Sequence, residues 1–172
     1  MSSAVTAVVA NVNDLPVGAV TIDDTTPAED QLLTAANTLT DADGLGAITY
    51  TWQRADDAAF STGLVTVGTG STFTPGDAEV GKYLRVTASY TDGQGTAESV
   101  SSAVTEAVLN VNDVPTGAVT IDDTTPAEDQ LLTATNTLGD ADGLGAVTYS
   151  WERADNAAFD TGVVTVGTGA TF

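Results

Sequence analysis

The sequence predicts an all-β protein built from β-sandwich repeats of 99 residues. Shifting the chain by 99 residues aligns residues 11–73 with residues 110–172, with 11 mismatches in 63 positions. Short runs rich in Val, Ile, Thr and Tyr are separated by clusters of Gly, Asp and Pro at spacings of about ten residues, a pattern typical of sandwiches. A unit of about 100 residues is large enough to hold its own core.

The repeat divides the chain into three parts. Residues 11–109 are expected to form a complete repeat, and residues 110–172 a truncated second repeat that lacks the equivalents of residues 74–109. Ser2–Val9 match Ser101–Val108, so residues 1–10 are expected to be the last strand of a preceding repeat.

Seven strands are expected in the complete repeat, which fits an immunoglobulin-like sandwich. Each run is rich in β-branched or aromatic residues and is bounded by turn-forming residues. In chain order the predicted strands are Val17–Ile22, Gln31–Leu39, Ala47–Arg54, Leu64–Val67, Ser71–Thr74, Lys82–Tyr90 and Thr96–Leu109. No segment has a convincing helical pattern.

The third and sixth predicted strands show the clearest alternation of side chains. In the third, Ile48, Tyr50 and Trp52 share one face, and Trp52 is expected at the centre of the core. In the sixth, the inward residues are Leu84, Val86, Ala88 and Tyr90. Before this strand, the spacing of Asp77 and Tyr83 resembles the tyrosine corner of immunoglobulin-like sandwiches.

Composition excludes several classes of function. The net charge is −20 with only four basic residues, which argues against binding to nucleic acid or to anionic membranes. Neither Cys nor His is present, so disulfides, thiolate metal sites and the commonest general base are absent. No apolar run approaches the ~20 residues that span a bilayer. A solvated acidic surface is one explanation of the bulk charge, and enzymatic activity is not expected.

Three acidic segments are expected to meet at one pole of the sandwich. They are the linker Asn11–Pro16, the loop Asp41–Gly44 after the second strand, and Asp92-Gly93 after the sixth. Together with their copies in the second repeat, and with a loop at the opposite pole, they supply the predicted metal ligands: Asn11, Asn13, Asp14, Asp23, Asp24, Asp41, Asp43, Asp92, Asn110, Asn112, Asp113, Asp140 and Asp142.

Calcium is the cation that suits these ligands. It takes six to eight oxygen ligands and tolerates irregular loops, whereas zinc prefers the His and Cys that the chain lacks. The Asp41–Gly44 loop is not an EF-hand, because Trp52 stands where the final glutamate is required. The alternatives are that Asp and Gly simply form turns, and that the loop holding Asp23 and Asp24 is a solvated acidic loop rather than a ligand source at the joint between repeats.

A family resemblance rests on the linker NVNDLP and the stretches LTDADGLGAITYTWQR and VGKYLRVTASYTDGQGTAESV. These resemble the extender repeats of giant bacterial adhesins of the RTX type, and the linker is similar to the calcium-linker motif of cadherins without its usual partner glutamates. The resemblance implies cadherin-like domains in tandem, calcium at the joints with neighbouring repeats, secretion, and display on the bacterial surface in cell adhesion and biofilm formation.

Two further readings stay open. Ser2–Val9 is a candidate for strand addition to a neighbouring chain, which would make the protein a self-assembling filament subunit. A sandwich that binds carbohydrate or protein ligands is less favoured, because it needs exposed aromatic residues while Tyr50, Trp52 and Tyr90 are expected in the core.

Overall fold

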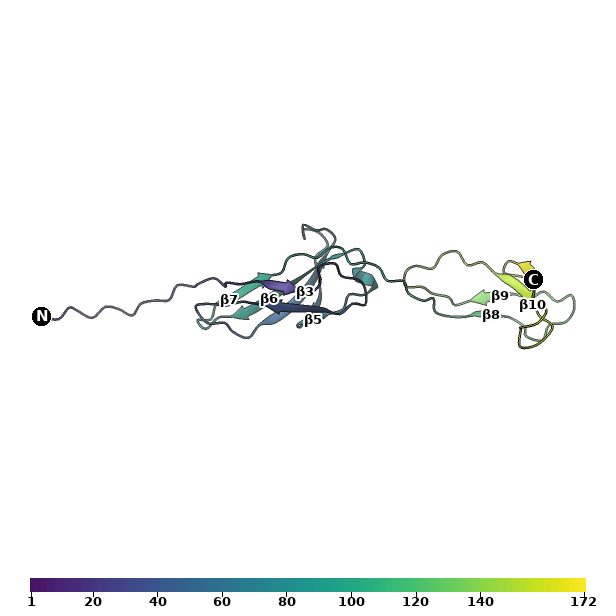
Figure 1. The fold of residues 1–172 in the computed structure, drawn as a ribbon, viewed down its shortest axis with the longest axis horizontal. Helices are drawn as coiled ribbons and strands as arrows, with labels where there is room; N and C mark the ends of the chain where they lie inside the picture. The colour runs from purple at the N-terminus through teal and green to yellow at the C-terminus, as the bar shows by residue number, and fades with distance from the viewer. The chain divides into compact units, whose positions relative to one another are not determined.

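The computed structural model describes residues 1–172 as two compact units, Met1–Val111 (unit 1) and Asn112–Phe172 (unit 2). Both consist of antiparallel strands joined by turns (Figure 1). The helical content is one 3-10 turn, η1 (Asp77–Glu79), and no helix has the length and hydropathy to cross a bilayer. The prediction of an all-β protein is therefore confirmed.

Unit 1 contains two antiparallel sheets. One has the strand order β1-β2-β5 and the other the order β4-β3-β6-β7. The strands are β1 (Val20–Ile22), β2 (Leu33–Asn37), β3 (Thr49–Ala55), β4 (Val65–Thr69), β5 (Thr72–Phe73), β6 (Tyr83–Thr91) and β7 (Ala97–Ser101). All seven overlap the predicted strands.

The core of unit 1 lies between the two sheets and is centred on Trp52. This side chain is fully buried, its indole Nε1 donates to the carbonyl of Gly70 at 3.0 Å, and its ring stacks on Phe73 of the other sheet with centroids 5.6 Å apart. Along β6, every second residue from Leu84 to Tyr90 is buried. The predicted inward faces of β3 and β6 are thus confirmed.

The last strand was predicted too long. Instead of extending over Thr96–Leu109, the regular ladder of β7 stops early and the chain continues irregularly beside β6. Hydroxyl side chains accept backbone hydrogen bonds there: Ser102 Oγ from the N–H of Val86 at 3.1 Å, and Thr105 Oγ1 from the N–H of Leu84 at 3.0 Å. Such local bonds compete with regular strand pairing, which explains the shorter strand.

The predicted tyrosine corner was wrong. A tyrosine corner requires a hydrogen bond from the tyrosine hydroxyl to backbone upstream of it, and the hydroxyl of Tyr83 forms none. The crossing from β5 to β6 is held instead by η1 and by Arg54, whose Nη1 donates to Glu79 Oε1 at 3.0 Å and also to the carbonyl of Ala78. The spacing of Asp77 and Tyr83 therefore did not indicate how this crossing is held, because the contacts come from Arg54 in β3.

Unit 2 repeats the first half of this arrangement. Its strands are β8 (Val119–Ile121), β9 (Ala134–Asn136), β10 (Ser150–Arg153) and β11 (Val164–Thr168), paired as β8-β9 and β10-β11. Trp151 donates to the carbonyl of Gly169 at 2.9 Å and stacks on Phe172 at 5.6 Å, as Trp52 does in unit 1.

The two units differ in how much of their apolar face is covered. Val20 is 4% exposed in unit 1, whereas its equivalent Val119 is 54% exposed in unit 2. Strands β3 and β6 pair along their length in unit 1, and residues 112–172 include no counterpart of β6 or β7. These two strands therefore close the core of unit 1.

Candidate functional site

Three segments far apart in the sequence meet at one end of unit 1, which we call the acidic pole. The N–H of Asp14 donates to Asp43 Oδ2 at 2.7 Å, which ties the linker to the loop between β2 and β3. The N–H of Gly93, in the loop between β6 and β7, donates to the carbonyl oxygens of Asp43 and Gly44, each at 3.1 Å. The predicted convergence of the three segments is confirmed.

Asp41 lies beneath this junction and links it to the core. Its Oδ1 accepts from the N–H of Asp43 at 2.8 Å, and its Oδ2 accepts from the hydroxyl of Tyr90. Burial raises the pKa of Tyr90, and the hydrogen bond and charge of Asp41, with the charges of Glu98 and Asp92, raise it further. Tyr90 therefore stays a neutral donor, and the carboxylates around it share one strongly negative region.

Asp92 is the most deeply buried carboxylate of the acidic pole, with 6% of its surface exposed. Its Oδ1 accepts from the N–H groups of Gln94 at 2.9 Å and Thr96 at 2.7 Å, while its Oδ2 has no hydrogen-bond donor. Burial alone would raise the pKa of Asp92, but bonds from Thr96, Gln94 and Gly95 outweigh it and hold the pKa below its usual range. The side chain is therefore ionised, with one buried oxygen left unsatisfied, which is costly without a ligand.

Glu98 is a member of the acidic pole that the sequence analysis missed. It stands opposite Tyr90 in the β6-β7 ladder, and its Oε1 accepts from Asn13 Nδ2 at 2.7 Å. The sequence analysis searched for acidic residues in turns such as Asp-Gly, and Glu98 lies in a strand. The antiparallel pairing of the last two strands, which brings Glu98 beside Tyr90, was the signal that would have identified it.

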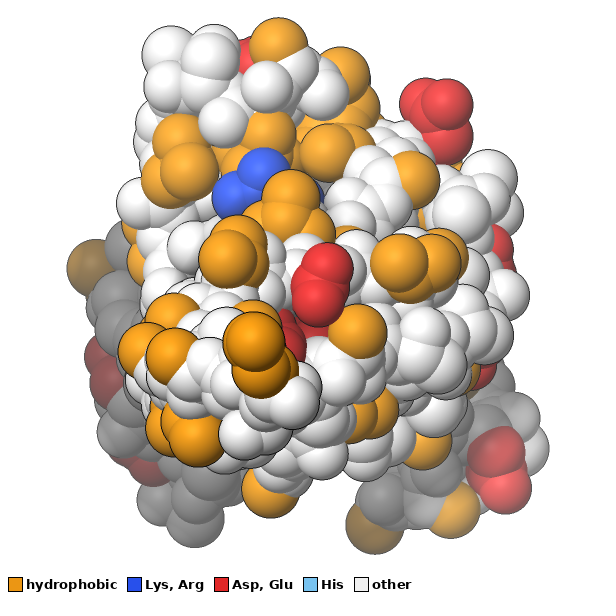
Figure 2. All heavy atoms as spheres, turned by 90° about the vertical axis from the view of Figure 1, so that its left-hand side faces the viewer, with side chains coloured by type: hydrophobic (Ala, Val, Ile, Leu, Met, Phe, Trp, Pro, Cys, Tyr) orange, Lys and Arg blue, Asp and Glu red, His pale blue; other side chains and the backbone are white.

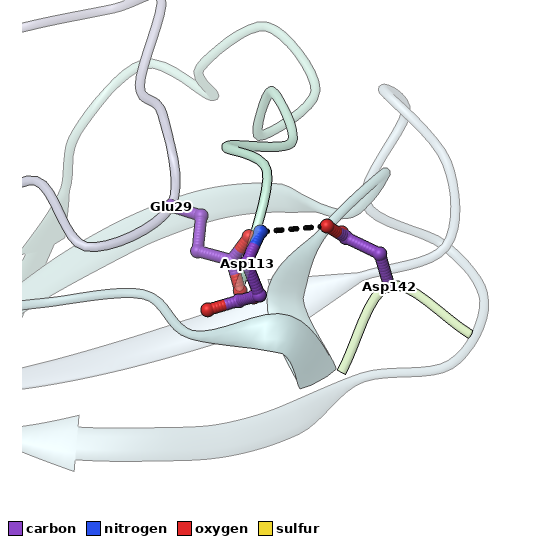
Figure 3. A group of neighbouring side chains, drawn as sticks. All are labelled: Glu29, Asp113 and Asp142. Carbon is purple, nitrogen blue, oxygen red and sulfur yellow. Dashed lines mark hydrogen bonds between the residues drawn. The ribbon is translucent and has the colours of Figure 1, made fainter. Parts of the chain in front are cut away.

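Unit 2 repeats two of these hydrogen bonds at positions shifted by 99 residues. The N–H of Asp113 donates to Asp142 Oδ2 at 2.7 Å, and the N–H of Asp142 donates to Asp140 Oδ1 at 3.0 Å. Figure 3 shows the first of them. Asn112 Nδ2 donates to the carbonyl of Asp113 at 2.7 Å. The linker and the following acidic loop therefore adopt the same bonded arrangement in both units.

Glu29, also drawn in Figure 3, lies in the loop between β1 and β2, the loop predicted to lie at the pole opposite the acidic pole. It is 4% exposed, and its Oε2 accepts from the N–H of Val111 at 3.4 Å. Since Val111 lies within the second linker, a buried carboxylate of unit 1 is bonded to the linker that leads to Asp113. The sequence analysis did not single out Glu29, because it lies in a loop with several other acidic residues.

Asp23 and Asp24, predicted as ligands at this second pole, hold their own loop together. Asp23 Oδ1 accepts from the N–H of Thr34 at 2.8 Å. Asp24 Oδ1 accepts from the N–H and hydroxyl of Thr26, and its Oδ2 from Gln31 Nε2 at 2.8 Å. The bond from Gln31, followed by those from Thr26, holds the pKa of Asp24 below its usual range. Asn11 and Asn110 are exposed.

The density of charge alone does not mark the acidic pole. On the face drawn in Figure 2, the carboxylates are separated by uncharged atoms and exposed hydrophobic side chains. The pole is distinguished instead by hydrogen bonds that join three segments, and by the buried oxygen of Asp92.

Gly93→Ala is expected to push the loops of the acidic pole apart and to destabilise unit 1 by about 1–3 kcal/mol. A Cβ at this position would lie 2.5 Å from the carbonyl oxygen of Asp43, and backbone cannot yield as a flexible side chain can. Gly76→Ala is the matched control, because a Cβ there meets nothing within 4 Å. Urea denaturation of both variants measures the difference, and equal stabilities would contradict the close approach of the two loops.

Comparison with known proteins gives no assignment for this arrangement. No protein-family model matches the chain, and no curated protein matches it.

Proposed function

We propose that the chain is a non-enzymatic spacer from a bacterial cell-surface adhesin, and that calcium bound at the acidic poles stiffens its immunoglobulin-like, cadherin-like repeats. The observation that carries the proposal is the buried, ionised carboxylate of Asp92, whose Oδ2 lacks a donor within a pole formed by the linker and two loops. The orders β1-β2-β5 and β3-β6-β7 support the immunoglobulin-like assignment, since they match strands A-B-E and C-F-G of such sandwiches. Strand β4 pairs with β3, in the place of the C′ strand of the variable type.

The chemical type of the side chains at the acidic pole suits a calcium ion. Asp41, Asp43, Asp92 and Glu98 offer carboxylate oxygens, and Asn13 offers a carboxamide oxygen. All are hard ligands, and all except Glu98, which is in β7, lie in the linker or in loops. A bound ion would neutralise charges that otherwise repel each other. Because the same ion would hold the linker against the loops, binding would restrict motion of the linker relative to the repeat.

This mechanism explains why the linker belongs to the site. Asp14 and Asp113 each donate a backbone N–H to an aspartate of the following loop, so the chain is tied to that loop directly after it enters each unit. Without a cation, repulsion among the carboxylates would weaken this attachment. The expected result is a spacer that is rigid in calcium and flexible and sensitive to proteases without it.

The test is thermal unfolding and limited proteolysis of the 172-residue chain in calcium, in magnesium at equal concentration, and in chelator. We expect a rise in Tm with calcium alone, because only ions bound by the folded state stabilise it. We also expect cleavage within the two linkers to slow in calcium. Equal effects of calcium and magnesium would indicate charge screening and would contradict the proposed site.

Strand addition between chains is a second candidate function. Ser2–Val9 are exposed, while residues of the matching segment, Ser102, Thr105 and Val108, are buried in unit 1. The free segment thus carries side chains that become buried where its copy docks. Growth of particle size with concentration in light scattering, abolished by deleting residues 1–10, is expected if chains exchange this strand. An unchanged size would exclude such assembly.

A further inference from the structure

The segment that closes unit 1, Ala107–Leu109, pairs with two different parts of the domain. It forms parallel bridges, Leu109 with Ala28 and Val108 with Val80, and an antiparallel bridge from Ala107 to Tyr83. These contacts lie at the pole opposite the acidic pole. The segment is thus held in place although it lies outside any regular strand.

The loop between β1 and β2 forms three backbone hydrogen bonds with residues 106–109. Leu109 N–H donates to the carbonyl of Pro27, Glu29 N–H donates to the carbonyl of Leu109, both at 2.9 Å, and Glu106 N–H donates to the carbonyl of Thr25 at 2.8 Å. They join residues far apart in sequence. Breaking this group therefore separates the beginning of the domain from its end.

The corner before β6 holds the other side of the same segment. Gly81 N–H donates to the carbonyl of Val108, and Val108 N–H donates to the carbonyl of Lys82, both at 2.9 Å. The side chain of Val108 is 2% exposed. The closing segment is therefore bonded on two sides and anchored in the core.

The loop that receives the closing segment is itself braced. Gln31 donates to Asp24 through Nε2 and accepts from the N–H of Ala28 through Oε1 at 3.0 Å. Asp30 has a φ of 59°, and its equivalent Asp129 in unit 2 has a φ of 62°. In unit 2 the bonds of Asp24 and Gln31 recur at positions shifted by 99 residues. The loop conformation is thus set by its local sequence and does not depend on the closing segment.

When the chain is stretched from its two ends, tension passes through unit 1 from β1 to Leu109. The hydrogen bonds between the loop and the closing segment lie on the shortest path between these two points. The loop follows β1, the first strand, and Leu109 is at the end of the domain. Because Ala28 and Leu109 belong to parallel segments, opposite pulls on the two ends slide them past each other. When two segments slide past each other, the bonds between them are loaded at the same time, whereas bonds between segments that are pulled apart from one end are loaded one after another.

We infer that the closing segment and the loop between β1 and β2 form a mechanical clamp that sets the force at which unit 1 unfolds when the chain is stretched. The inference deepens the proposed spacer function, since a tether between a cell and a surface bears tension. The clamp needs no bound ion, because its bonds are between backbone groups. The effect of calcium at the acidic pole and the effect of the clamp at the other pole can therefore be measured separately.

The test is single-molecule force spectroscopy on the full chain, held at its two ends. Leu109→Pro removes the N–H that donates to Pro27, and the side chain of Leu109 is exposed, so little packing is lost. We expect the unfolding force of unit 1 to fall to half or less. Unit 1 is recognised by a released length of roughly 300 Å, at about 3.3–3.6 Å per residue.

The direction of pulling is the control. The chain has no cysteine, so handles can be attached at Ser71→Cys and Gln94→Cys, two exposed loop positions outside the path through the clamp. Leu109→Pro should leave the unfolding force in that direction unchanged. An equal proportional fall in both directions, or no fall end to end, would overturn the clamp.

Two further measurements complete the test. Urea denaturation first shows whether Leu109→Pro is folded. If it is not, Glu106→Pro, which removes the hydrogen bond to the Thr25 carbonyl, is used instead. Each protein is also stretched in chelator. If the clamp exists, the variant lowers the unfolding force in chelator as well. A change in the unfolding force of the parent chain on adding calcium tests the spacer proposal separately.

Discussion

Trp52→Ala is expected to destabilise unit 1 by about 3–5 kcal/mol, a large part of the stability of a domain of this size. The indole is fully buried, contacts both sheets and donates to the carbonyl of Gly70. Its removal leaves a cavity and an acceptor without its donor. Urea denaturation followed by circular dichroism measures the change, because the substitution removes one of the two tryptophans.

Two controls identify the origin of this loss. Val65→Ala shortens a side chain that is 44% exposed on an edge strand and is expected to change stability by less than about 1 kcal/mol. Trp151→Ala makes the same change as Trp52→Ala in unit 2. A Trp52→Ala effect no larger than that of Val65→Ala would mean that the core of unit 1 is not centred where the structure places it.

Asp92→Asn is expected to remove at least half of the rise in Tm that calcium gives the parent chain. At a calcium concentration 100 times the Kd, one site adds about 2.7 kcal/mol, which corresponds to roughly 10 °C or more for a domain of this size. Asparagine keeps the shape of the side chain, and its oxygen can still accept from Gln94 and Thr96. The variant thus removes the charge and one candidate ligand oxygen, with little change in shape.

Stability in chelator is compared separately from the calcium effect. There, Asp92→Asn should be less stable than the parent chain, because the hydrogen bonds that hold the pKa of Asp92 below its usual range favour the ionised carboxylate in the folded state. Asp77→Asn is the matched control, since Asp77 is exposed and outside the acidic pole. It should retain the full calcium effect. A Tm for Asp92→Asn that rises with calcium as the parent's does would exclude Asp92 as a ligand.

The sequence was sufficient for the strands and for the convergence of loops at the acidic pole. The alternation around Trp52 placed β3 correctly, and the connectivity of a seven-stranded sandwich brought Asp43 beside Gly93. Both predictions depend on periodicity and topology, which are regular. They hold because the hydrophobic face of each strand leaves little freedom in its placement.

Details that depend on single hydrogen bonds were not predictable in the same way. The early end of β7 follows from Ser102 and Thr105, whose hydroxyls accept bonds that a strand would direct elsewhere, and their composition alone resembles a strand. Glu98 joined the acidic pole through cross-strand pairing with Tyr90. Asp24 forms hydrogen bonds within its own loop, as Asp residues commonly do in turns, and its charge alone did not indicate these bonds.

The closeness of the two copies has a consequence for how such a chain can change in length. The two linkers differ only at Leu15 and its equivalent Val114, and both precede an acidic loop with the sequence DADG. Both loops after the first strand form the same internal bonds. Insertion or loss of 99 residues at any matching point therefore leaves every junction with the chemistry it had before. The number of domains can change without a new interface having to arise. The length of the chain can therefore change while the local structure of each junction stays the same.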